Sequence, residues 1–162
     1  MIYYTDGSCT GNGKAVNEGG FGVVTLNDDG TFADAYAKRN NNTTNNREEL
    51  RAILRVMLTA GVHHSNEWVH PPVVYSDSAY CVNTFNSWMW GWEKRGWLKS
   101  DNKEPENLDL IRAYHTLWNR GYRIDLRKCK GHAGDHWNEQ VDKLAVSAKE
   151  GCNTITLNFK KG

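Results

Sequence analysis

Short apolar runs separated by polar turn residues make up the N-terminal quarter of the chain. Three of these runs have the length and composition of β-strands, and they cover residues 2–6, 19–26 and 31–39. The second and third runs are joined by residues 27–30, whose Asp-Gly ending is a strong signal for a hairpin turn. The pattern therefore predicts three antiparallel strands that follow one another along the chain.

Apolar positions then change to a helical period. Between about Asn45 and Ala60 they recur three and four residues apart, which predicts a helix with one apolar stripe. The stripe consists of Leu50, Ile53, Leu54, Met57 and Leu58. Residues 73–75 form a short apolar run that predicts a buried strand.

The remaining segments alternate between helical and strand-like patterns. Helical patterns cover residues 78–86, 88–97, 108–119 and 138–149, and an alternating pattern at 122–128 predicts a further strand. Strands in a meander, followed by strands that alternate with helices, are typical of a mixed sheet covered by helices. The chain is therefore predicted to belong to the α/β class.

Two adjacent glutamates lie at the start of the first predicted helix. Glu48 is about 180° from the middle of the apolar stripe, so we expect it to face water. Asn45, three residues earlier, is placed to cap the helix in a capping box with Glu48. Glu49 is about 80° from the stripe, where a carboxylate is costly unless it is paired or bound to a cation. The helix pattern leaves two interpretations of Glu49 open: an edge side chain that reaches solvent, or one that carries chemistry.

Composition limits the class of protein. The chain has 162 residues, of which 39% are hydrophobic and 24% charged, and this is typical of one soluble globular domain over residues 1–162. No apolar run approaches the roughly 20 residues of a membrane helix, and the N-terminus lacks a secretory pattern. We therefore expect a cytoplasmic protein without a membrane partner. The four cysteines are widely spaced, which favours reduced thiols over a disulfide framework or a zinc site.

Three aspartates could complete a site with Glu49. Asp6 ends the first predicted strand, Asp77 follows the buried strand, and Asp142 lies in the last predicted helix. Taken singly, each is more often a cap or turn residue than a ligand. Acids at the carboxyl ends of neighbouring strands meet at one sheet edge, and four clustered carboxylates would take up protons or bind Mg²⁺ or Mn²⁺. Two such ions about 4 Å apart suit the displacement of a phosphodiester oxygen.

Six segments combine into a specific series of motifs: YTDGSCTGNG, GGFGVV, TNNREEL, YSDSAYC, WEKRGW and KGHAGDHWNEQVDKLA. In this order and spacing they closely resemble type 1 ribonuclease H of the bacterial kind, from Tyr3 to about Ala148. The resemblance implies a five-stranded mixed sheet, with three antiparallel strands and then two parallel ones, flanked by helices. It also implies metal-dependent endonucleolytic cleavage of the RNA strand of an RNA/DNA hybrid, which leaves 5′-phosphate and 3′-hydroxyl ends.

The resemblance implies roles for individual residues. The metal-binding carboxylates of the family fall on Asp6, Glu49, Asp77 and Asp142, which would hold two Mg²⁺ ions with substrate, and Mn²⁺ could substitute. Glu48 falls on a position that is not catalytic in the family. The loop histidine of the family falls on His132, between two glycines, where it can move a proton or help product leave. Without the flanking motif, a lone loop histidine is usually just exposed.

Substrate contacts are implied in the same way. Backbone groups near Cys9, together with Glu49, are expected to sense the 2′-hydroxyls of RNA. Polar positions expected to contact the hybrid are Asn12, Thr44, Asn45 and Asn46. The segment WMWGWEKRGWLKS, which includes Trp88, Lys94 and Arg95, resembles the basic protrusion that grips the DNA strand. The alternative that Trp88 and Trp92 are core residues stays open. Because the formal net charge is only +1, hybrid binding must depend on such local patches.

Several positions depart from the family pattern. Ala79 stands where bacterial relatives often have glutamine, Glu93 stands where a basic residue is common, and the loops at 11–18 and 62–72 differ in length. None of these departures touches the four carboxylates. Because the four carboxylates and His132 are all retained, we expect a hybrid endonuclease rather than a binding module. The methionine directly before the first strand and the nearly complete family length favour an independent protein, and nothing demands more than a monomer. The alternatives are a hybrid-binding module that has lost catalysis, a related polynucleotidyl transferase, or a nuclease domain of a polymerase.

Overall fold

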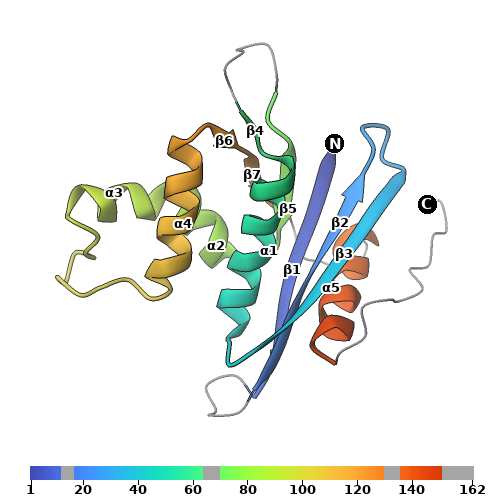
Figure 1. Cartoon of the computed structure of the whole chain (residues 1–162), viewed down its shortest axis with the longest axis horizontal. Helices are drawn as coiled ribbons and strands as arrows, with labels where there is room; N and C mark the ends of the chain where they lie inside the picture. Colours follow the sequence, from blue (N-terminus) through green and yellow to red (C-terminus); the bar gives the residue numbers. More distant parts are fainter. Residues whose placement is uncertain (12–16, 64–69, 130–135, 151–162) are drawn as a thin grey trace.

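The central element of the fold is a mixed β-sheet. The computed structural model describes residues 1–11, 17–63, 70–129 and 136–150 (Figure 1). The strands of this sheet are β1 (Ile2–Thr10), β2 (Glu18–Leu26), β3 (Phe32–Asn41), β5 (Val73–Ser76) and β7 (Asp125–Lys128). Their order is β3-β2-β1-β5-β7: β1 to β3 are antiparallel, and β5 and β7 continue the sheet parallel to β1. The predicted five-stranded mixed sheet is confirmed.

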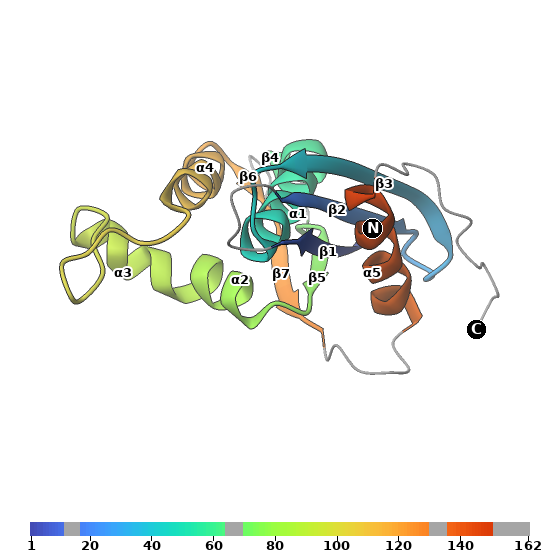
Figure 2. The ribbon, with the colours of Figure 1, turned by 90° about the horizontal axis from the view of Figure 1, so that it is seen from below.

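Helices lie on both sides of the sheet, as Figures 1 and 2 show. Helix α1 (Asn45–Ala60) packs on one face, and helix α5 (His136–Lys149) packs on the other. A helical arm extends away from the sheet on the α1 side, and α3 lies at its far end. The arm consists of α2 (Ala79–Asn83), the π-helical turn η1 (Thr84–Trp88), α3 (Met89–Lys94) and the returning helix α4 (Leu108–Asn119).

Two hydrophobic cores follow from the alternation of side chains along β2. Phe21 and Val23 join the larger core under α1, whereas Val24 and Leu26 join the smaller core under α5. The smaller core is completed by Val141 and Leu144 of α5. The larger core also contains Leu50, Ile53, Met57, Val74, Phe85, Ile111 and Leu126.

The buried face of α1 differs from the predicted stripe. Leu58 is 57% exposed, so its assignment to the buried stripe is wrong. Ala52 and Val56 are buried instead, because α1 packs against α4 as well as against the sheet. The buried face therefore extends further round the helix, toward Glu48 and Glu49, than the stripe alone indicates.

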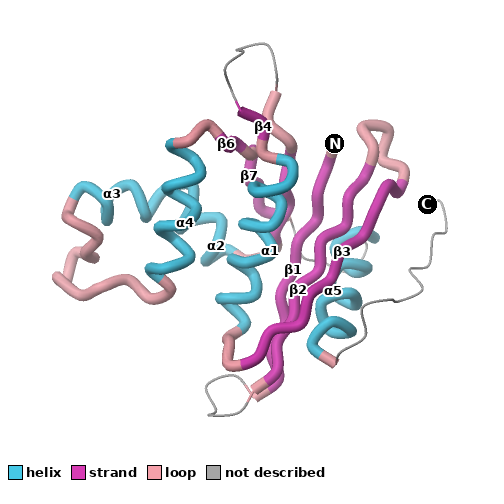
Figure 3. Tube along the Cα trace, in the orientation of Figure 1, coloured by secondary structure: helices cyan, strands magenta, loops and turns pink. Residues whose placement is uncertain are grey.

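Three other elements differ from the sequence prediction. The strand predicted over 122–128 is divided into β6 (Tyr122–Arg123) and β7, and β6 pairs with the unpredicted strand β4 (Val62–His63) in a separate two-stranded sheet (Figure 3). The helices predicted over 78–86 and 88–97 form one continuous helical path that ends at Lys94. Within the described ranges, no helix has the length and apolar character needed to cross a membrane.

Candidate active site

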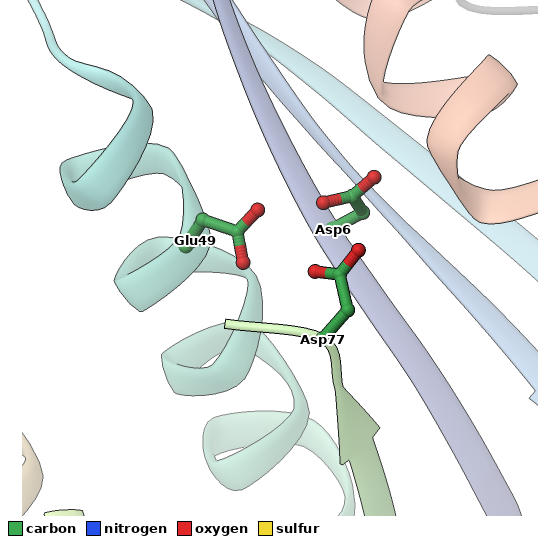
Figure 4. A group of neighbouring side chains, drawn as sticks. All are labelled: Asp6, Glu49 and Asp77. Carbon is green, nitrogen blue, oxygen red and sulfur yellow. The ribbon is translucent and has the colours of Figure 1, made fainter. Parts of the chain in front are cut away.

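Three of the predicted carboxylates come together from three different elements. Asp6 lies on β1, Asp77 directly follows β5, and Glu49 lies in the first turns of α1 (Figure 4). One carboxylate oxygen from each lies within 4.8 Å of the others. Asp6 and Glu49 are buried, with exposed fractions of 4% and 9%, and Asp77 is half-buried. The grouping predicted for these three residues is present.

The strand register brings the two aspartates together. Thr5 of β1 pairs with Ser76 of β5 in parallel, so the next residues, Asp6 and Asp77, lie side by side. The prediction that the first strand ends at Asp6 is wrong, because β1 continues to Thr10 through its pairing with β2. Asp6 instead marks the point where the parallel pairing with β5 stops. The acidic residues thus lie directly after the last paired residues of two neighbouring parallel strands, which is where ligand-binding sites of α/β sheets commonly lie.

Gly7 allows α1 to begin directly against β1. Its backbone N–H lies 2.9 Å from Asp6 Oδ1 and donates to Glu49 Oε1 at 3.1 Å. A Cβ atom at this position would overlap the backbone of Glu48 and Glu49. A residue with any side chain would therefore push the helix, and the Glu49 carboxylate with it, away from the strand.

Burial and mutual repulsion raise the pKa values of the three acids. For Asp6 the largest cause is burial, followed by its hydrogen bond with Glu49 and the nearby charges of Glu49 and Asp77. Burial is also the largest cause that raises the pKa of Glu49, and the charge of Asp77 adds to it, while the hydrogen bond with Asp6 lowers it. Asp6 and Glu49 therefore titrate as a coupled pair. Burial and the charge of Asp142 raise the pKa of Asp77.

The cluster fits a divalent cation. Among the residues that the structure describes, Glu49 Oε2 is buried and has no hydrogen-bond partner. A buried carboxylate oxygen without a partner is costly unless a cation or a proton satisfies it. All the candidate ligand atoms are carboxylate oxygens, which favours hard ions such as Mg²⁺ or Mn²⁺.

Asp142 lies at the rim of the same pocket. It is exposed on α5 and is not among the three acids whose oxygens cluster. The pocket has a volume of about 430 Å³ and is lined by Gly7, Ser8, Cys9, Asn45, Asn46, Glu49, Asp77, Ser78 and Asp142. The fourth predicted carboxylate thus lines the same pocket as Glu49 and Asp77, and it contributes to the raised pKa values of Asp6 and Asp77.

The predicted substrate residues fall into three groups. Cys9, Asn45 and Asn46 line the pocket. Trp88, Lys94 and Arg95 are exposed on the helical arm, with Trp88 at 46% exposure, so the interpretation of Trp88 as a core residue is wrong. Two further predictions, Asn12 and His132, lie outside the described residues.

The residue that caps the start of α1 is Thr44, and not Asn45 as the sequence predicted. Its hydroxyl accepts a hydrogen bond from the Arg47 N–H at 3.1 Å, so Thr44 is the N-cap of α1. Asn45 is the first helical residue, and the predicted cap at Asn45 is therefore wrong. A cap one residue earlier leaves the Asn45 side chain in the pocket wall.

Glu48 is the clearest error of the sequence prediction. Its side chain is fully buried rather than facing water, and it accepts hydrogen bonds from Asn40, Thr43 and Arg51. The end of β3 and the following residues cover this side of α1, and Arg51, three residues along the helix, supplies the compensating charge. The period of apolar residues along a helix does not show that the preceding strand will cover one of its sides. The spacing of three residues between Glu48 and Arg51 did indicate that the two side chains could pair.

The fold and the acidic group together define a class of protein: an α/β domain in which three carboxylates that could hold a metal ion gather where the parallel pairing of β1 and β5 ends. The family model for RNase H matches residues 1–150. The chain therefore belongs to the ribonuclease H family. Ribonuclease H of Syntrophomonas wolfei is 36% identical over 149 residues, which cover 91% of this chain and 94% of that protein. Ribonuclease H of Mannheimia succiniciproducens is 37% identical and the match covers 95% of this chain and 88% of that protein.

Solved structures agree with this assignment. LC9-RNase H1, a type 1 RNase H with the type 2 active-site motif, is 30% identical, with a TM-score of 0.68 over 93% of this chain and 72% of that one. The prototype foamy virus (PFV) RNase H domain, at 22% identity, has a TM-score of 0.75 over 94% of this chain and 95% of that one, and supports the fold alone. LC11-RNase H1, solved with an RNA/DNA hybrid, has a TM-score of 0.64 at 21% identity and covers 93% of this chain and 96% of that one.

Proposed function

We propose that this ribonuclease H hydrolyses the RNA strand of RNA/DNA hybrids at the pocket beside Asp6, Glu49 and Asp77. The observation that carries the proposal is the convergence of these three acids, with raised pKa values and a buried Glu49 oxygen that lacks a partner. Membership of the ribonuclease H family gives the reaction type. LC11-RNase H1, of the same fold, was solved in complex with an RNA/DNA hybrid, which supports the same substrate class here.

The cofactor that fits these residues is Mg²⁺, which Asp6, Glu49 and Asp77 would hold, with Asp142 as a fourth ligand from the rim. When bound, two such ions would supply a nucleophilic water and stabilise the leaving 3′-oxygen, and this chemistry would leave 5′-phosphate and 3′-hydroxyl ends. Mn²⁺ has the same preference for oxygen ligands and could substitute. His132 would move the proton that accompanies product departure.

Residues around the acids would orient the hybrid. The Gly7 N–H holds Glu49, and Ser8 and Cys9 continue the pocket wall beside it, where RNA 2′-hydroxyls can be sensed. Asn45 and Asn46 also line the pocket and would offer amide groups to the hybrid backbone, and contacts from Thr44 and Asn12 belong to the same proposal. Trp88, Lys94 and Arg95 would hold the DNA strand along the arm.

A hybrid-binding module without activity is the competing function. Incubation of purified protein with an end-labelled RNA/DNA hybrid and Mg²⁺ distinguishes an active endonuclease from a binding module. We expect cleavage of the RNA strand only, and loss of cleavage with a chelator or in the Asp77→Asn variant. Hybrid binding without any Mg²⁺-dependent cleavage by the unmodified protein would support the binding module instead. Action as a cytoplasmic monomer stays a prediction.

A further inference from the structure

A second buried polar cluster lies beside the active site, where β3 passes into α1. It consists of Asn17, Asn40, Thr43, Glu48 and Arg51, and we call it the junction cluster. Glu48 is fully buried, Thr43 is 2% exposed, and Asn17 is 9% exposed. No member of the cluster lines the active-site pocket. A buried charge of this kind needs a function or a full set of partners to offset its desolvation.

Thr43 is held at each of its polar atoms. Its N–H donates to Asn17 Oδ1 at 2.7 Å, and its carbonyl accepts from Cys9 Sγ at 3.6 Å. Its hydroxyl donates to Glu48 Oε2 at 3.0 Å and accepts from Arg51 Nη1 at 3.0 Å. Four contacts from three separate parts of the chain thus fix one residue of a short connection.

Glu48 and Arg51 close the cluster from the helix side. Glu48 Oε2 lies 2.7 Å from Arg51 Nη1, and Glu48 Oε1 accepts from Asn40 Nδ2 at 2.7 Å. A Cβ on Gly19 would overlap Thr43 Cγ2 and lie 3.0 Å from Glu48 Cγ, so the cluster packs directly onto β2. The whole arrangement leaves no space for the connection to shift toward the sheet.

The position fixed in this way is directly adjacent to the proposed substrate wall. Thr44 follows Thr43 and caps α1, and the pocket-lining Asn45 and Asn46 come next. Asn42, on the other side of Thr43, has a positive φ of 51°, so the chain turns sharply there. Glu49 follows Glu48 on the same helical turn, but its carboxylate is already held by Gly7.

We propose that Glu48 and Arg51 are positioning residues that set Thr44, Asn45 and Asn46 for hybrid binding. This inference rests on the proposed function, because it assigns the wall formed by these residues to the hybrid. Glu48 and Arg51 act through Thr43. Neither residue lines the pocket or belongs to the group of acids formed by Asp6, Glu49 and Asp77. The pair should therefore govern substrate affinity rather than the chemical step.

The test compares Glu48→Gln and Thr43→Val with the unmodified protein. Steady-state cleavage of a labelled hybrid gives KM and kcat, and binding of the hybrid in the presence of a chelator, where no cleavage occurs, gives Kd. We expect KM and Kd to rise roughly tenfold while kcat changes less than about twofold, since a misplaced wall weakens binding before chemistry. Thr43→Val keeps a side chain of similar shape and replaces the hydroxyl with a methyl group, so both hydrogen bonds of that hydroxyl are lost. Glu18→Gln, which breaks the exposed pair with Arg39, is the matched control and should leave both constants unchanged.

The double variant Glu48→Met/Arg51→Met separates positioning from stability. Two apolar side chains can replace a buried ion pair with little loss of stability, so its Tm should recover relative to Glu48→Gln. KM and Kd should stay raised, because the Thr43 hydroxyl has lost both partners. Recovery of KM and Kd together with Tm would overturn the proposal, as would a large fall in kcat at unchanged KM.

The proposed function can fail independently. If the unmodified protein binds hybrid without cleaving it, the proposed function fails while the Kd values of the same variants still decide the positioning proposal. If Kd is the same for Glu48→Gln, Thr43→Val and the unmodified protein, the positioning proposal is overturned even where cleavage is normal.

Discussion

Asp6 and Asp77 lie side by side because the parallel pairing of β1 and β5 ends one residue before each of them. Their position is therefore imposed by backbone hydrogen bonds and not by attraction between the side chains. Carboxylates held together in this way repel one another unless a proton or a cation lies between them. The same arrangement that suits metal binding should thus weaken the metal-free fold.

Asp77→Asn should abolish activity and stabilise the metal-free protein. Loss of a residue that only orients a ligand costs 10–100-fold, so loss of a ligand should reduce cleavage by more than about a hundredfold. Removal of one charge should raise the Tm in a chelator by about 2–4 °C, equivalent to about 1 kcal/mol. Scanning calorimetry measures this. Asp125→Asn, at an exposed ion pair with Arg127, is the control and should give no increase.

The metal-free protein should become less stable as pH rises. A carboxyl whose pKa is raised on folding binds its proton more tightly in the folded state, so its contribution favours folding at low pH. That contribution is lost as pH rises above the ordinary carboxyl value of about 4. The raised pKa values of Asp6, Glu49 and Asp77 all act in this direction. Urea unfolding in a chelator should therefore give a lower free energy at about pH 8 than at about pH 5.5.

Mg²⁺ should remove this dependence, because the cation replaces the protons and binds better as pH rises. The Asp6→Asn variant should show a smaller pH effect in the chelator than the unmodified protein. An unmodified protein that is equally stable at both pH values without metal would contradict the assignment of raised pKa values to this cluster.

Gly7→Ala should destabilise the protein and reduce cleavage. A Cβ at Gly7 overlaps the Glu49 N and Glu48 C atoms, and overpacking against backbone costs about 1–3 kcal/mol or more. Gly91→Ala is the matched control, because a Cβ there meets nothing within 4 Å and lies in helix α3. It should stabilise by up to about 1 kcal/mol. Equal unfolding free energies for the two variants would show that α1 does not need its close approach to β1.

The sequence predicted the parts of the site that local patterns record. Asp77 follows a short apolar strand, and Glu49 lies near the apolar face of a helix, so both positions could be inferred before the structure. The first strand was predicted to stop at Asp6 because its apolar residues stop there. It continues because β2 supplies hydrogen bonds to the next four residues, and such pairing is a tertiary property.

The wrong predictions for α1 concern which sides of the helix other segments of the chain cover. Glu48 was predicted to face water, yet the end of β3 covers it and Arg51 pairs with it. Leu58 was predicted to be buried, yet the contact with α4 moves the buried face of α1 away from it. Periodicity along one helix cannot show which of its sides a strand or a second helix will reach.

Arg47 and Asp109 should contribute modestly to stability by joining the first turns of α1 and α4. Two hydrogen bonds of 2.9 and 2.7 Å join the guanidinium and the carboxylate, and they lower the pKa of Asp109 to about 2. Because the Asp109 side chain is 64% exposed, a double-mutant cycle with Arg47→Met and Asp109→Asn should give a coupling of only about 0.5–1 kcal/mol. The pKa of Asp109 is lowered on folding, so this coupling should be lost as pH falls from about 4 toward 2. A coupling free energy at about pH 2.5 that equals the value at neutral pH would contradict this pH dependence.

Trp88 and Trp92 should have separable roles although their rings lie 6.3 Å apart. Trp88 is 46% exposed, whereas Trp92 packs against the larger core. Stacking on an aromatic surface is worth about 1–3 kcal/mol, so Trp88→Ala should weaken hybrid binding roughly tenfold with little change in Tm. Trp92→Ala should instead lower the unfolding free energy by about 2 kcal/mol through lost packing. Fluorescence anisotropy of a labelled hybrid and urea unfolding measure the two effects, and the reverse pattern would place the nucleic-acid contact on Trp92.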